Sequence, residues 1–405
     1  SPQLRFEGFT DDWEERKLSE GTSKIGDGLH GTPNYSDNGD VFFINGNNLV
    51  NGKIVITKET KLVTESNQSK DDKLLNMDTI LMSINGTIGN LAWYNNERVM
   101  LGKSAAYLTV SNFDKKFIFS YLQTSTIKNY FLNNLTGTTI KNLGLKTIRD
   151  TTLFVPTLEE QQKIGSLFKQ LDDTIALHQR KLDLFKEQKK GYLQKMFPKN
   201  GAKVPELRFA GFADDWEERK LSDLFIKGGS GGTPKSTNKA FYDGDIPFLG
   251  ISDITKSNGF INNTEKHISS DGLNSSAAWI VSKGAISLAM YASVGKLAIL
   301  NIDAATSQAF YNMIFDDYDL RDLVYQRLNK ANELSEWNKL ISTGTQSNLN
   351  ADKVKNFQMY LPKNHDEIKL ISTFFKQIDN TIALHQRKLD LLKEQKKGFL
   401  QKMFV

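Results

Sequence analysis

The chain has 405 residues, a formal net charge of +5, 24% charged and 39% hydrophobic residues, and no cysteine. The lack of cysteine excludes disulfides, thiol chemistry and Cys-ligated zinc, and it fits a cytoplasmic protein. No apolar run approaches the ~20 residues of a membrane-spanning helix, so we expect no contact with a membrane. The mildly basic charge is compatible with a nucleic-acid partner and does not establish one.

The chain repeats its own frame. Residues 4–20 return at 207–223 with 14 of 17 positions identical, and residues 174–197 return at 381–404 with 22 of 24 identical. The segments between these anchors share little. If the two halves had diverged uniformly after a duplication, the anchor segments would differ as much as the residues between them. The pattern therefore predicts two different readers on one common frame.

The repeat divides the chain into five segments. In chain order they are a first variable domain (1–155), a helix (156–197), a linker (198–206), a second variable domain (207–361) and a second helix (362–405). Each half has about 200 residues, which is long enough for a core of its own.

Both variable domains read as short strands and helices. β-branched and aromatic runs bounded by Asn and Gly predict strands at 40–44, 52–56, 79–84, 106–110, 246–251, 285–290 and 309–314. Helical patterns cover 116–133 and 319–341. We therefore expect a mixed α/β fold in each domain. The glycine cluster at 228–232 predicts a flexible loop rather than a dinucleotide cradle.

A long helix is predicted at the end of each half. Thr157 with Glu160, and Asn364 with Glu367, have the spacing of a capping box, and about 40 residues without an internal proline follow each of them. Apolar residues recur with the 3-4 spacing of a left-handed coiled coil. The expected seam consists of Leu171, Ile175, His178, Leu182 and Phe185 in the first helix and Ile378, Ile382, His385, Leu389 and Leu392 in the second.

The two helices are expected to pair with each other in antiparallel orientation, because both carry the same seam. The alternative is that each helix packs on its own domain. In the antiparallel pair, the segment from Leu4 would lie beside the end of the second helix as the segment from Leu207 lies beside the first. The fold would then be pseudo-circular, with a pseudo-twofold internal repeat. The two seam histidines are interpreted as polar devices that set the register.

No catalytic or metal-binding motif is complete. Gly102-Lys103-Ser104 resembles the end of a P-loop, but residue 97 is Glu where the motif requires Gly. The five histidines form no H-x-x-x-H pair, and no Asn-Pro-Pro-aromatic motif is present. We therefore expect no catalytic residue, no metal site and no cofactor in this chain.

DNA binding has better support. Loops rich in Gly place amide, hydroxyl and basic side chains together, and Gly-Thr-Pro and Thr-Gly-Thr recur in both halves. Asn and Gln suit adenine, Lys suits guanine, and Thr suits phosphates. The candidates in the first half are Thr32, Asn34, Tyr35, Asn47, Asn85, Thr87, Lys103, Thr136, Thr138, Thr139 and Lys141. Those in the second half are Thr233, Lys235, Ser252, Tyr291, Ser293, Lys296, Gln308, Thr343, Thr345, Gln346 and Asn348. Ordinary turn chemistry is the alternative for any single loop.

The chain resembles the specificity subunits of type I restriction–modification enzymes. The resemblance rests on the Leu-Arg-Phe-x-Gly-Phe-x-Asp-Asp-Trp-Glu pair, the Gly-Thr-Pro and Thr-Gly-Thr pairs, and the repeated helices, and it covers essentially the whole chain. It implies two target recognition domains that each read half of a bipartite double-stranded DNA site. The two helices would set the gap between the half-sites. One departure is the second helix start, which lacks the Glu-Glu-Gln of the first.

The resemblance also implies the partners. Two methyltransferase subunits, which carry S-adenosylmethionine and the adenine N6-methyltransferase site, would dock on this bacterial, cytoplasmic subunit. Two restriction subunits, which use ATP and Mg²⁺, can join them. The subunit itself would be non-catalytic. Two alternatives from other classes are a fused methyltransferase or nuclease, and a pseudo-dimeric transcription regulator that needs no methyltransferase.

Overall fold

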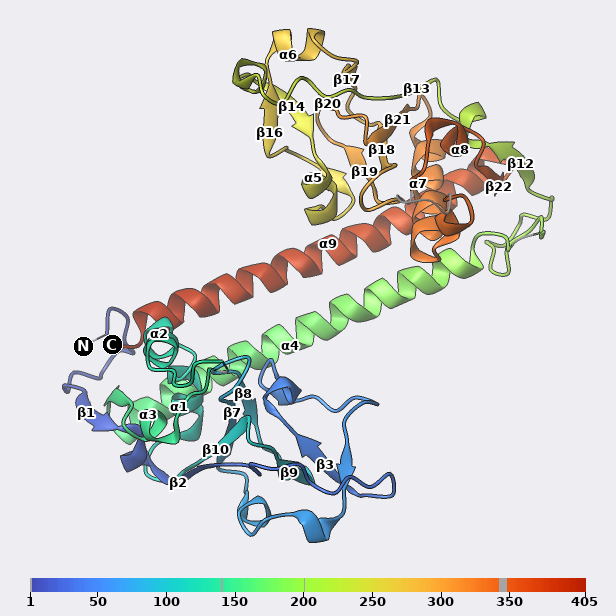
Figure 1. Ribbon diagram of the computed structural model, residues 1–405. Helices are drawn as coiled ribbons and strands as arrows, with labels where there is room; N and C mark the ends of the chain where they lie inside the picture. Colours follow the sequence, from blue (N-terminus) through green and yellow to red (C-terminus); the bar gives the residue numbers. More distant parts are fainter. Residues whose placement is uncertain (1, 140, 200, 342–347) are drawn as a thin grey trace. The chain divides into compact units, whose positions relative to one another are not determined.

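The computed structural model describes residues 2–139, 141–199, 201–341 and 348–405. The chain divides into two compact units. Unit 1 comprises residues 1–178 and 388–405, and unit 2 comprises residues 179–387. Each unit therefore contains one variable domain and a part of both long helices, α4 (Leu158–Lys195) and α9 (His365–Lys402) (Figure 1).

Unit 1 holds a four-stranded sheet, a three-stranded sheet and two short pairs. The four-stranded order is β2 (Thr22–Asp27), β10 (Ala105–Val110), β7 (Thr79–Ser83) and β8 (Leu91–Trp93). The three-stranded order is β6 (Leu62–Val63), β3 (Val41–Ile44) and β9 (Val99–Leu101). The pairs are β1 (Glu14–Lys17) with β11 (Thr152–Val155), and β4 (Leu49–Val50) with β5 (Lys53–Ile54).

Unit 2 holds a five-stranded sheet, a four-stranded sheet and one short pair. The five-stranded order is β13 (Lys227–Ser230), β21 (Phe310–Ile314), β18 (Ile286–Ala289), β19 (Leu297–Leu300) and β15 (Phe260–Ile261). The four-stranded order is β16 (Lys266–Ile268), β14 (Ile246–Leu249), β20 (Ala304–Thr306) and β17 (Ile280–Val281). The pair is β12 (Glu217–Lys220) with β22 (Gln358–Leu361).

The two units share the order of their core strands, to which unit 2 adds β15 and β17 at the sheet edges. β10 lies antiparallel between β2 and β7, as β21 lies between β13 and β18. β3 pairs antiparallel with β6 and parallel with β9, as β14 pairs with β16 and β20. The mixed α/β fold and the internal repeat expected from the sequence are confirmed.

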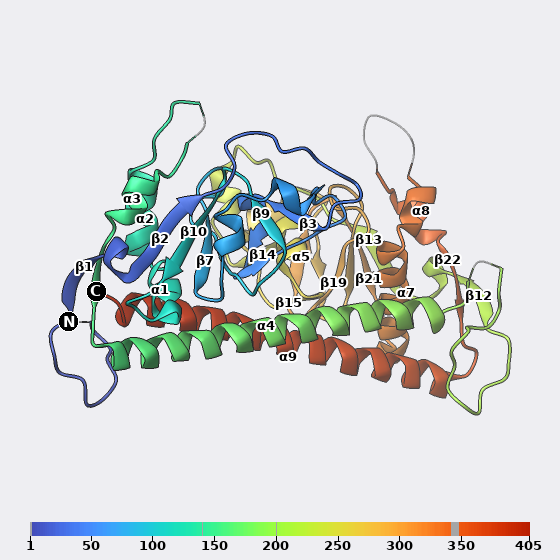
Figure 2. The ribbon, with the colours of Figure 1, turned by 90° about the horizontal axis from the view of Figure 1, so that it is seen from below.

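Shorter helices complete each unit. Unit 1 has α1 (Lys115–Tyr121), α2 (Ser125–Asn133) and α3 (Leu145–Arg149), and unit 2 has α5 (Ile251–Lys256), α6 (Ser270–Asn274), α7 (Tyr318–Glu333) and α8 (Ala351–Lys355). Single 3-10 turns occupy Leu18–Gly21, Gly46–Asn48, Glu65–Asn67, Asp72–Leu74, Leu221–Asp223, Lys239–Tyr242 and Glu336–Lys339. In unit 1, α1 lies beside α4 (Figure 2). The two helices approach closely at Gly165, where a Cβ would lie 2.6 Å from the Phe117 nitrogen.

Three sequence expectations are corrected. The helix at 116–133 is two helices, because Thr124 accepts a hydrogen bond from Ile127 N and starts a new N-terminus. The helix at 319–341 ends at Glu333, where Ser335 adopts a positive φ of 54°. The glycine cluster at 228–232 is not a free loop, since Gly228 and Gly229 belong to β13 and pair with β21.

The long helices pair antiparallel within each unit. In unit 1, Lys396 of α9 forms an ion pair with Asp172 of α4 at 2.6 Å. In unit 2, Lys189 of α4 forms the equivalent pair with Asp379 of α9 at 2.7 Å. The burial of the seam fits the predicted pattern, since its ten residues are buried or half-buried and none is exposed. The antiparallel coil is confirmed.

The pseudo-circular closure is also present. Leu4 N donates to Lys402 O at 2.8 Å in unit 1, and Leu207 N donates to Lys195 O at 2.9 Å in unit 2. Phe404 at the end of the chain then packs against Tyr121 and Phe168 in the core of unit 1, with ring centroids 4.8 and 5.5 Å away. The C-terminal residues of α9 thus belong to the unit that contains the N-terminus.

The helix starts differ from the predicted capping boxes. Thr157 Oγ1 accepts from Glu160 N at 3.5 Å, and Asn364 Oδ1 accepts from Asp366 N at 2.8 Å, so the N-caps are present. The carboxylate of Glu160, however, accepts two hydrogen bonds from Arg5, at 2.7 and 2.8 Å. In the second copy Glu367 does the same with Arg208. The two glutamates tie the repeated entry segments to the helices.

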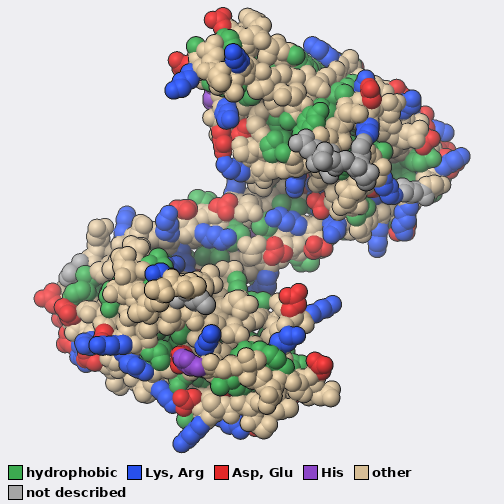
Figure 3. Space-filling view, viewed as in Figure 1, with side chains coloured by type: hydrophobic (Ala, Val, Ile, Leu, Met, Phe, Trp, Pro, Cys, Tyr) green, Lys and Arg blue, Asp and Glu red, His purple; other side chains and the backbone are tan. Residues whose placement is uncertain are grey.

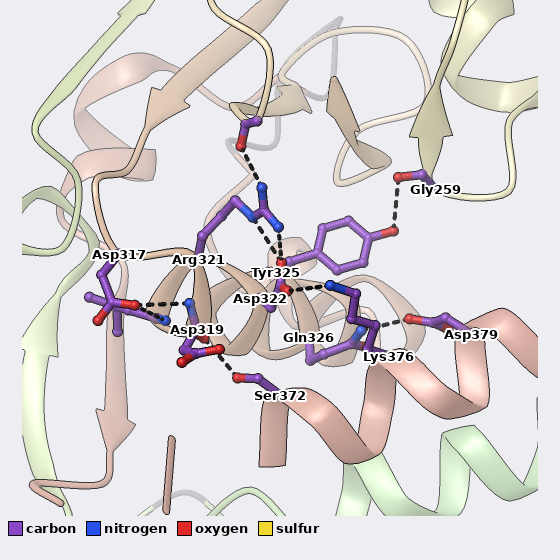
Figure 4. Close-up of polar contacts among 12 residues, drawn as sticks. Gly259, Asp317, Asp319, Arg321, Asp322, Tyr325, Gln326, Ser372, Lys376 and Asp379 are labelled. Atoms are coloured by element: carbon purple, nitrogen blue, oxygen red, sulfur yellow. Dashed lines mark hydrogen bonds and ion pairs between the residues drawn. The ribbon is translucent and has the colours of Figure 1, made fainter. Parts of the chain in front are cut away.

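The second domain rests on α9 through a polar face of α7 (Figure 4). Gln326 Nε2 donates to Asp379 Oδ2 at 2.7 Å, and Ser372 Oγ donates to Asp319 O at 2.7 Å. The hydroxyl of Tyr325 donates to Gly259 O at 3.4 Å on the opposite side of α7. These contacts connect the loop-bearing sheets of unit 2 to the helix that crosses into unit 1.

Candidate nucleic-acid interface

The candidate loops of unit 1 converge at Gly46. A Cβ at this residue would lie 2.8 Å from Ser104 O, 2.9 Å from Ser83 Cβ and 3.4 Å from Asn85 O. Glycine is required there because two other chain segments approach its backbone. The loop that carries Asn47 therefore touches the loops that follow β7 and β9.

Side chains lock these loops together. Ser104 Oγ donates to Asn45 Oδ1 at 2.9 Å and accepts from Gly46 N at 2.8 Å. The amide nitrogen of Asn85 faces Asn142 Oδ1 at 2.7 Å. A rigid platform results, with Lys103 exposed next to Ser104.

Residues 135–139 and 141–142 lie beside this platform. Thr136 and Asn142 exchange two backbone hydrogen bonds of 2.9 Å, and Leu143 N donates to Ile84 O at 2.9 Å. Between these anchors Thr138, Thr139 and Lys141 are exposed, as are Thr136 and Thr87 on the neighbouring turn. The structure therefore brings Asn85, Thr87 and these residues together.

The loop with Gly-Thr-Pro borders the same platform. Leu29 N donates to Leu101 O at 2.7 Å, which places the loop beside the end of β9. Thr32 and Asn34 are exposed. Tyr35 is 48% exposed, but its ring packs edge-on against Phe43 with centroids 5.8 Å apart. The buried part of the Tyr35 side chain therefore holds the loop against β3.

Unit 2 gathers its candidate loops in the same way. Gly232 N donates to Thr306 O at 3.0 Å, Met290 N to Ala309 O at 2.7 Å, and Leu349 N to Met290 O at 3.0 Å. These bonds bring together the loops that carry Thr233, Gln308, Tyr291 and Asn348. The loop after β14 lies alongside, since Leu249 pairs with Thr306.

Backbone hydrogen bonds establish which residues of the two units correspond. Gly89 N donates to Ser83 O, and Gly295 N donates to Ala289 O. With the bonds from Leu143 and Leu349, both turns align at an offset of 206 residues. The aligned pairs are Asn85 with Tyr291, Thr87 with Ser293, and Asn142 with Asn348.

The Gly-Thr-Pro motifs do not occupy equivalent places. The backbone ladder aligns Leu29 with Gly232, because each donates to the end of the parallel strand, at Leu101 and Thr306. The motif of the first unit, which begins at Gly31, therefore lies two residues further from the strand. Aligning the two Gly-Thr-Pro motifs by sequence therefore shifts this loop by two residues from the alignment that the backbone hydrogen bonds give.

The turn after β18 is strained where its counterpart is not. Gly86 and Gly89 have φ of 70° and 79°, which glycine adopts freely. In unit 2 the neighbouring non-glycine residues Ala292 and Ser293 adopt φ of 29° and 60°. Such backbone persists only where the surroundings determine it, and it clusters at functional sites.

The remaining candidates of unit 2 vary in their environment. Lys235 and Lys296 are exposed, whereas Ser252 donates from Oγ to Glu265 Oε2 at 3.1 Å. Hydrogen bonding to Lys256 and Ser252 holds the pKa of Glu265 below its usual range, so this corner carries a carboxylate. Thr343, Thr345 and Gln346 lie outside the described residues.

Buried polar groups support the loops of unit 1. Asp72 is buried, and its oxygens accept from Leu101 N at 3.0 Å and Ser69 N at 2.8 Å. Burial and the hydrogen bond to Asp71 raise the pKa of Tyr107, which therefore remains a neutral donor. On the face shown in Figure 3, cationic and anionic side chains are interspersed over each unit.

Among the described residues, one group of potential metal ligands meets the distance requirement, namely Asp317, Asp319 and His365. Asp317 already caps α7, because its Oδ1 accepts from Asp319 N and Leu320 N at 2.9 and 3.0 Å. Its Oδ2 contacts His365 Nε2 at 2.9 Å. Asp317 thus caps α7 and contacts His365. In the described part of the chain, no helix is long and apolar enough to cross a membrane.

Sequence reasoning missed Asn142 and Ser104 as residues that hold the loops. Asn142 was visible in the sequence, because Asn-Leu recurs as Asn348-Leu349 at the offset of the turns. Ser104 left no comparable signal, since its role depends on β3 and β9 being neighbours in the sheet.

Comparison with known proteins identifies the frame. The family model of the type I restriction modification DNA specificity domain matches residues 10–186 and 213–394. The chain is 28% identical over 183 residues to the type I restriction enzyme MjaIX specificity subunit of Methanocaldococcus jannaschii, covering 44% of the chain and 41% of that protein. It is 29% identical over 174 residues to the HindI specificity subunit of Haemophilus influenzae, covering 41% of the chain and 37% of that protein. These alignments thus span about two fifths of each relative.

Solved structures agree at the level of the fold. The S subunit of a type I restriction–modification system from M. genitalium has a TM-score of 0.66 at 14% identity, covering 100% of this chain and 99% of that chain. A structure on the assembly and conformational transition of the type I R-M system contains a chain with a TM-score of 0.53 at 16% identity, with 97% and 98% covered.

Proposed function

The chain belongs to the type I restriction–modification DNA specificity family, and from that premise we propose that each of its two units reads one half of a bipartite double-stranded DNA target. One observation carries the proposal. The loops of both units are held by the same pattern of backbone hydrogen bonds, yet the side chains at equivalent positions differ, as with the half-buried Asn85 and the exposed Tyr291. A common frame with different contact residues suits the reading of two different base sequences.

We further infer that the chain is non-catalytic and scaffolds two methyltransferase subunits. Unit 2 exposes Leu370 of α9 by 45%. Besides this residue, each unit exposes one leucine of α4 and one of α9 at the same heptad position. They are Leu177 and Leu391 in unit 1, exposed by 44% and 70%, and Leu184 and Leu384 in unit 2, exposed by 56% and 64%. Large exposed apolar side chains that recur in this way favour an interface. Because both units present the same pair, two copies of one partner fit.

Cofactors then belong to the partners. The methyltransferase subunits would supply S-adenosylmethionine and the adenine N6-methyltransferase site. Restriction subunits, where they join, would supply ATP and Mg²⁺ chemistry. The helices α4 and α9, at 38 residues each, would set the separation of the half-sites.

The test of target recognition is to co-express this chain with the adenine methyltransferase subunit of its own system and map N6-methyladenine by single-molecule sequencing. We expect a split motif with a fixed gap. The methyltransferase alone serves as the control and should give no such motif. Tight DNA binding by the chain without added methylation would contradict the proposal and favour a transcription regulator. Methylation by the isolated chain would identify an enzyme.

The docking proposal has a separate test. Replacing Leu177 and Leu391 with Gln removes the exposed apolar pair of unit 1 alone, and we expect the complex to fall from two methyltransferase subunits per chain to one. Light scattering after size exclusion measures the mass. The matched control is Lys181→Gln with Lys393→Gln, at exposed polar positions of the same helices. Two subunits retained by the leucine variant would refute this surface.

A further inference from the structure

Two exposed side chains from separate loops of unit 2 hold each other. Thr233 Oγ1 donates a hydrogen bond to Gln308 Oε1, although the residues are 75 positions apart. The backbone beneath them is closely packed. Gly232 N donates to Thr306 O at 3.0 Å, and a Cβ at Gly231 would lie 1.8 Å from the same carbonyl oxygen.

The contact fixes the direction of an amide that would otherwise rotate freely at the surface. Gln308 is exposed, so its orientation is not set by packing. With Oε1 accepting from Thr233, one lone pair of Oε1 and both Nε2 hydrogens are left for a ligand. A side-chain amide with an acceptor and a donor side by side matches the N6 and N7 positions of adenine in the major groove.

The equivalent position of unit 1 carries a different chemistry. β3 aligns Ile44 with Leu101 as β14 aligns Leu249 with Thr306, so Lys103 corresponds to Gln308. Lysine donates three hydrogen bonds and accepts none, which suits the two acceptors of guanine. One place in the common frame thus presents an amide in unit 2 and an ammonium group in unit 1.

From this geometry we propose that Gln308 reads an adenine in the half-site of unit 2, and that Thr233 is the residue that positions its amide. The inference rests on the proposed function, because it assigns a base contact within that DNA interface. It goes further by naming one residue, one base and one positioning hydroxyl.

The experiment is the methylation map repeated with variants of the full chain, co-expressed with its methyltransferase. We expect Gln308→Ala to lose discrimination at one A·T pair of one half-site by about tenfold to a hundredfold, the range of a bidentate contact. Thr233→Val removes only the hydroxyl and should weaken discrimination at that same pair. Thr233→Ser, which restores a hydroxyl, should restore it. Lys103→Ala should relax the other half-site.

The outcomes separate this inference from the proposed function. If the wild-type chain directs no split motif, the proposed function fails. If it does, an even loss of methylation at all sites by Gln308→Ala, with an unchanged thermal unfolding midpoint, overturns the base contact. Relaxation at a G·C pair overturns the adenine assignment. An effect of Thr233→Val that Thr233→Ser does not rescue overturns the positioning role.

Discussion

Lys330 of α7 shows how a single residue connects domain and helix. Its side chain is buried, and Nζ donates to Phe197 O at 3.2 Å and to Pro198 O at 3.0 Å, just past the end of α4. Carbonyl groups at a helix C-terminus lack intrahelical donors, so an ammonium group is a suitable partner. Burial nevertheless lowers the pKa of Lys330 from 10.5 to about 8.

This shift predicts a pH dependence of stability. Because the pKa of Lys330 is lower in the folded state than in the unfolded chain, the unfolded chain binds more protons between pH 8 and 10.5. The contribution of this group to the free energy of unfolding should therefore rise with pH across that window. Denaturant unfolding of the wild type and of Lys330→Met at pH 7, 9 and 10.5 gives this contribution as the difference between their free energies of unfolding. A difference in the free energy of unfolding that does not change with pH would contradict the prediction.

The ion pair between Arg5 and Glu160 is a second contact in which a single residue joins two segments of the chain. Glu160 is fully buried, and hydrogen bonding to it raises the pKa of Arg5. We expect Arg5→Ala to lower the free energy of unfolding of unit 1 by about 3–5 kcal/mol, because it leaves a buried carboxylate unpaired. Arg208→Ala should do the same in unit 2, where Glu367 is the buried partner. The double variant Arg5→Met, Glu160→Met is the control and should cost less than Arg5→Ala.

At the scale of elements, the two helices are joined by charges as well as by the apolar seam. Lys189 and Lys396 each lie one heptad after a seam leucine, Leu182 or Leu389, at a position where an apolar residue is expected. The structure shows why they are tolerated, since each reaches an aspartate of the antiparallel helix. Their side chains are 17% and 16% exposed, so water screens these pairs only partly.

We predict that Lys396→Asp destabilises unit 1 by about 1–3 kcal/mol, between the values for exposed and buried pairs. It places two carboxylates side by side. Adding Asp172→Lys restores opposite charges, and most of the stability should return. Thermal unfolding of the single and swapped variants measures this. A swapped variant no more stable than Lys396→Asp would show that the ion pair does not hold the helices.

At the scale of the whole molecule, the closure of the chain determines how each unit is built. Unit 1 is complete only with residues 388–405, because Phe404 lies among the core residues Phe117, Tyr121 and Phe168. Phe197 takes the corresponding place beside Trp216 and Phe375 in unit 2. Each domain therefore depends on the far end of the opposite helix.

The length of the paired helices leads to a prediction about the target. Deleting residues 179–185 of α4 together with 386–392 of α9 removes one heptad from each helix and preserves the pairing of Lys396 with Asp172. The helices shorten by about 10 Å, which corresponds to ~3 base pairs at 3.4 Å per pair. We expect the methylated motif to keep both half-sites with a gap about 3 base pairs shorter. An unchanged gap would refute the idea that the helices set the spacing.

The sequence by itself determined the features that depend on local periodicity and repetition. The heptads of α4 and α9, the alternation of frame and variable domain, and most strands are readable from neighbouring residues, because burial imposes a period on one element at a time. The pairing of like seams even indicated the closure near Leu4. The family resemblance followed from the same repeated residues.

Only the tertiary structure decided which residues of different strands and loops are in contact. Glu160 binds Arg5 instead of closing a capping box, the Gly-Thr-Pro loops are offset by two residues, and Thr233 contacts Gln308. Each of these features depends on residues that are far apart in the chain. A local pattern indicates which face of a strand is buried, but it does not identify the strand or loop that packs beside it. For this reason the sequence named the loops of the interface, while the structure matched their residues between the units.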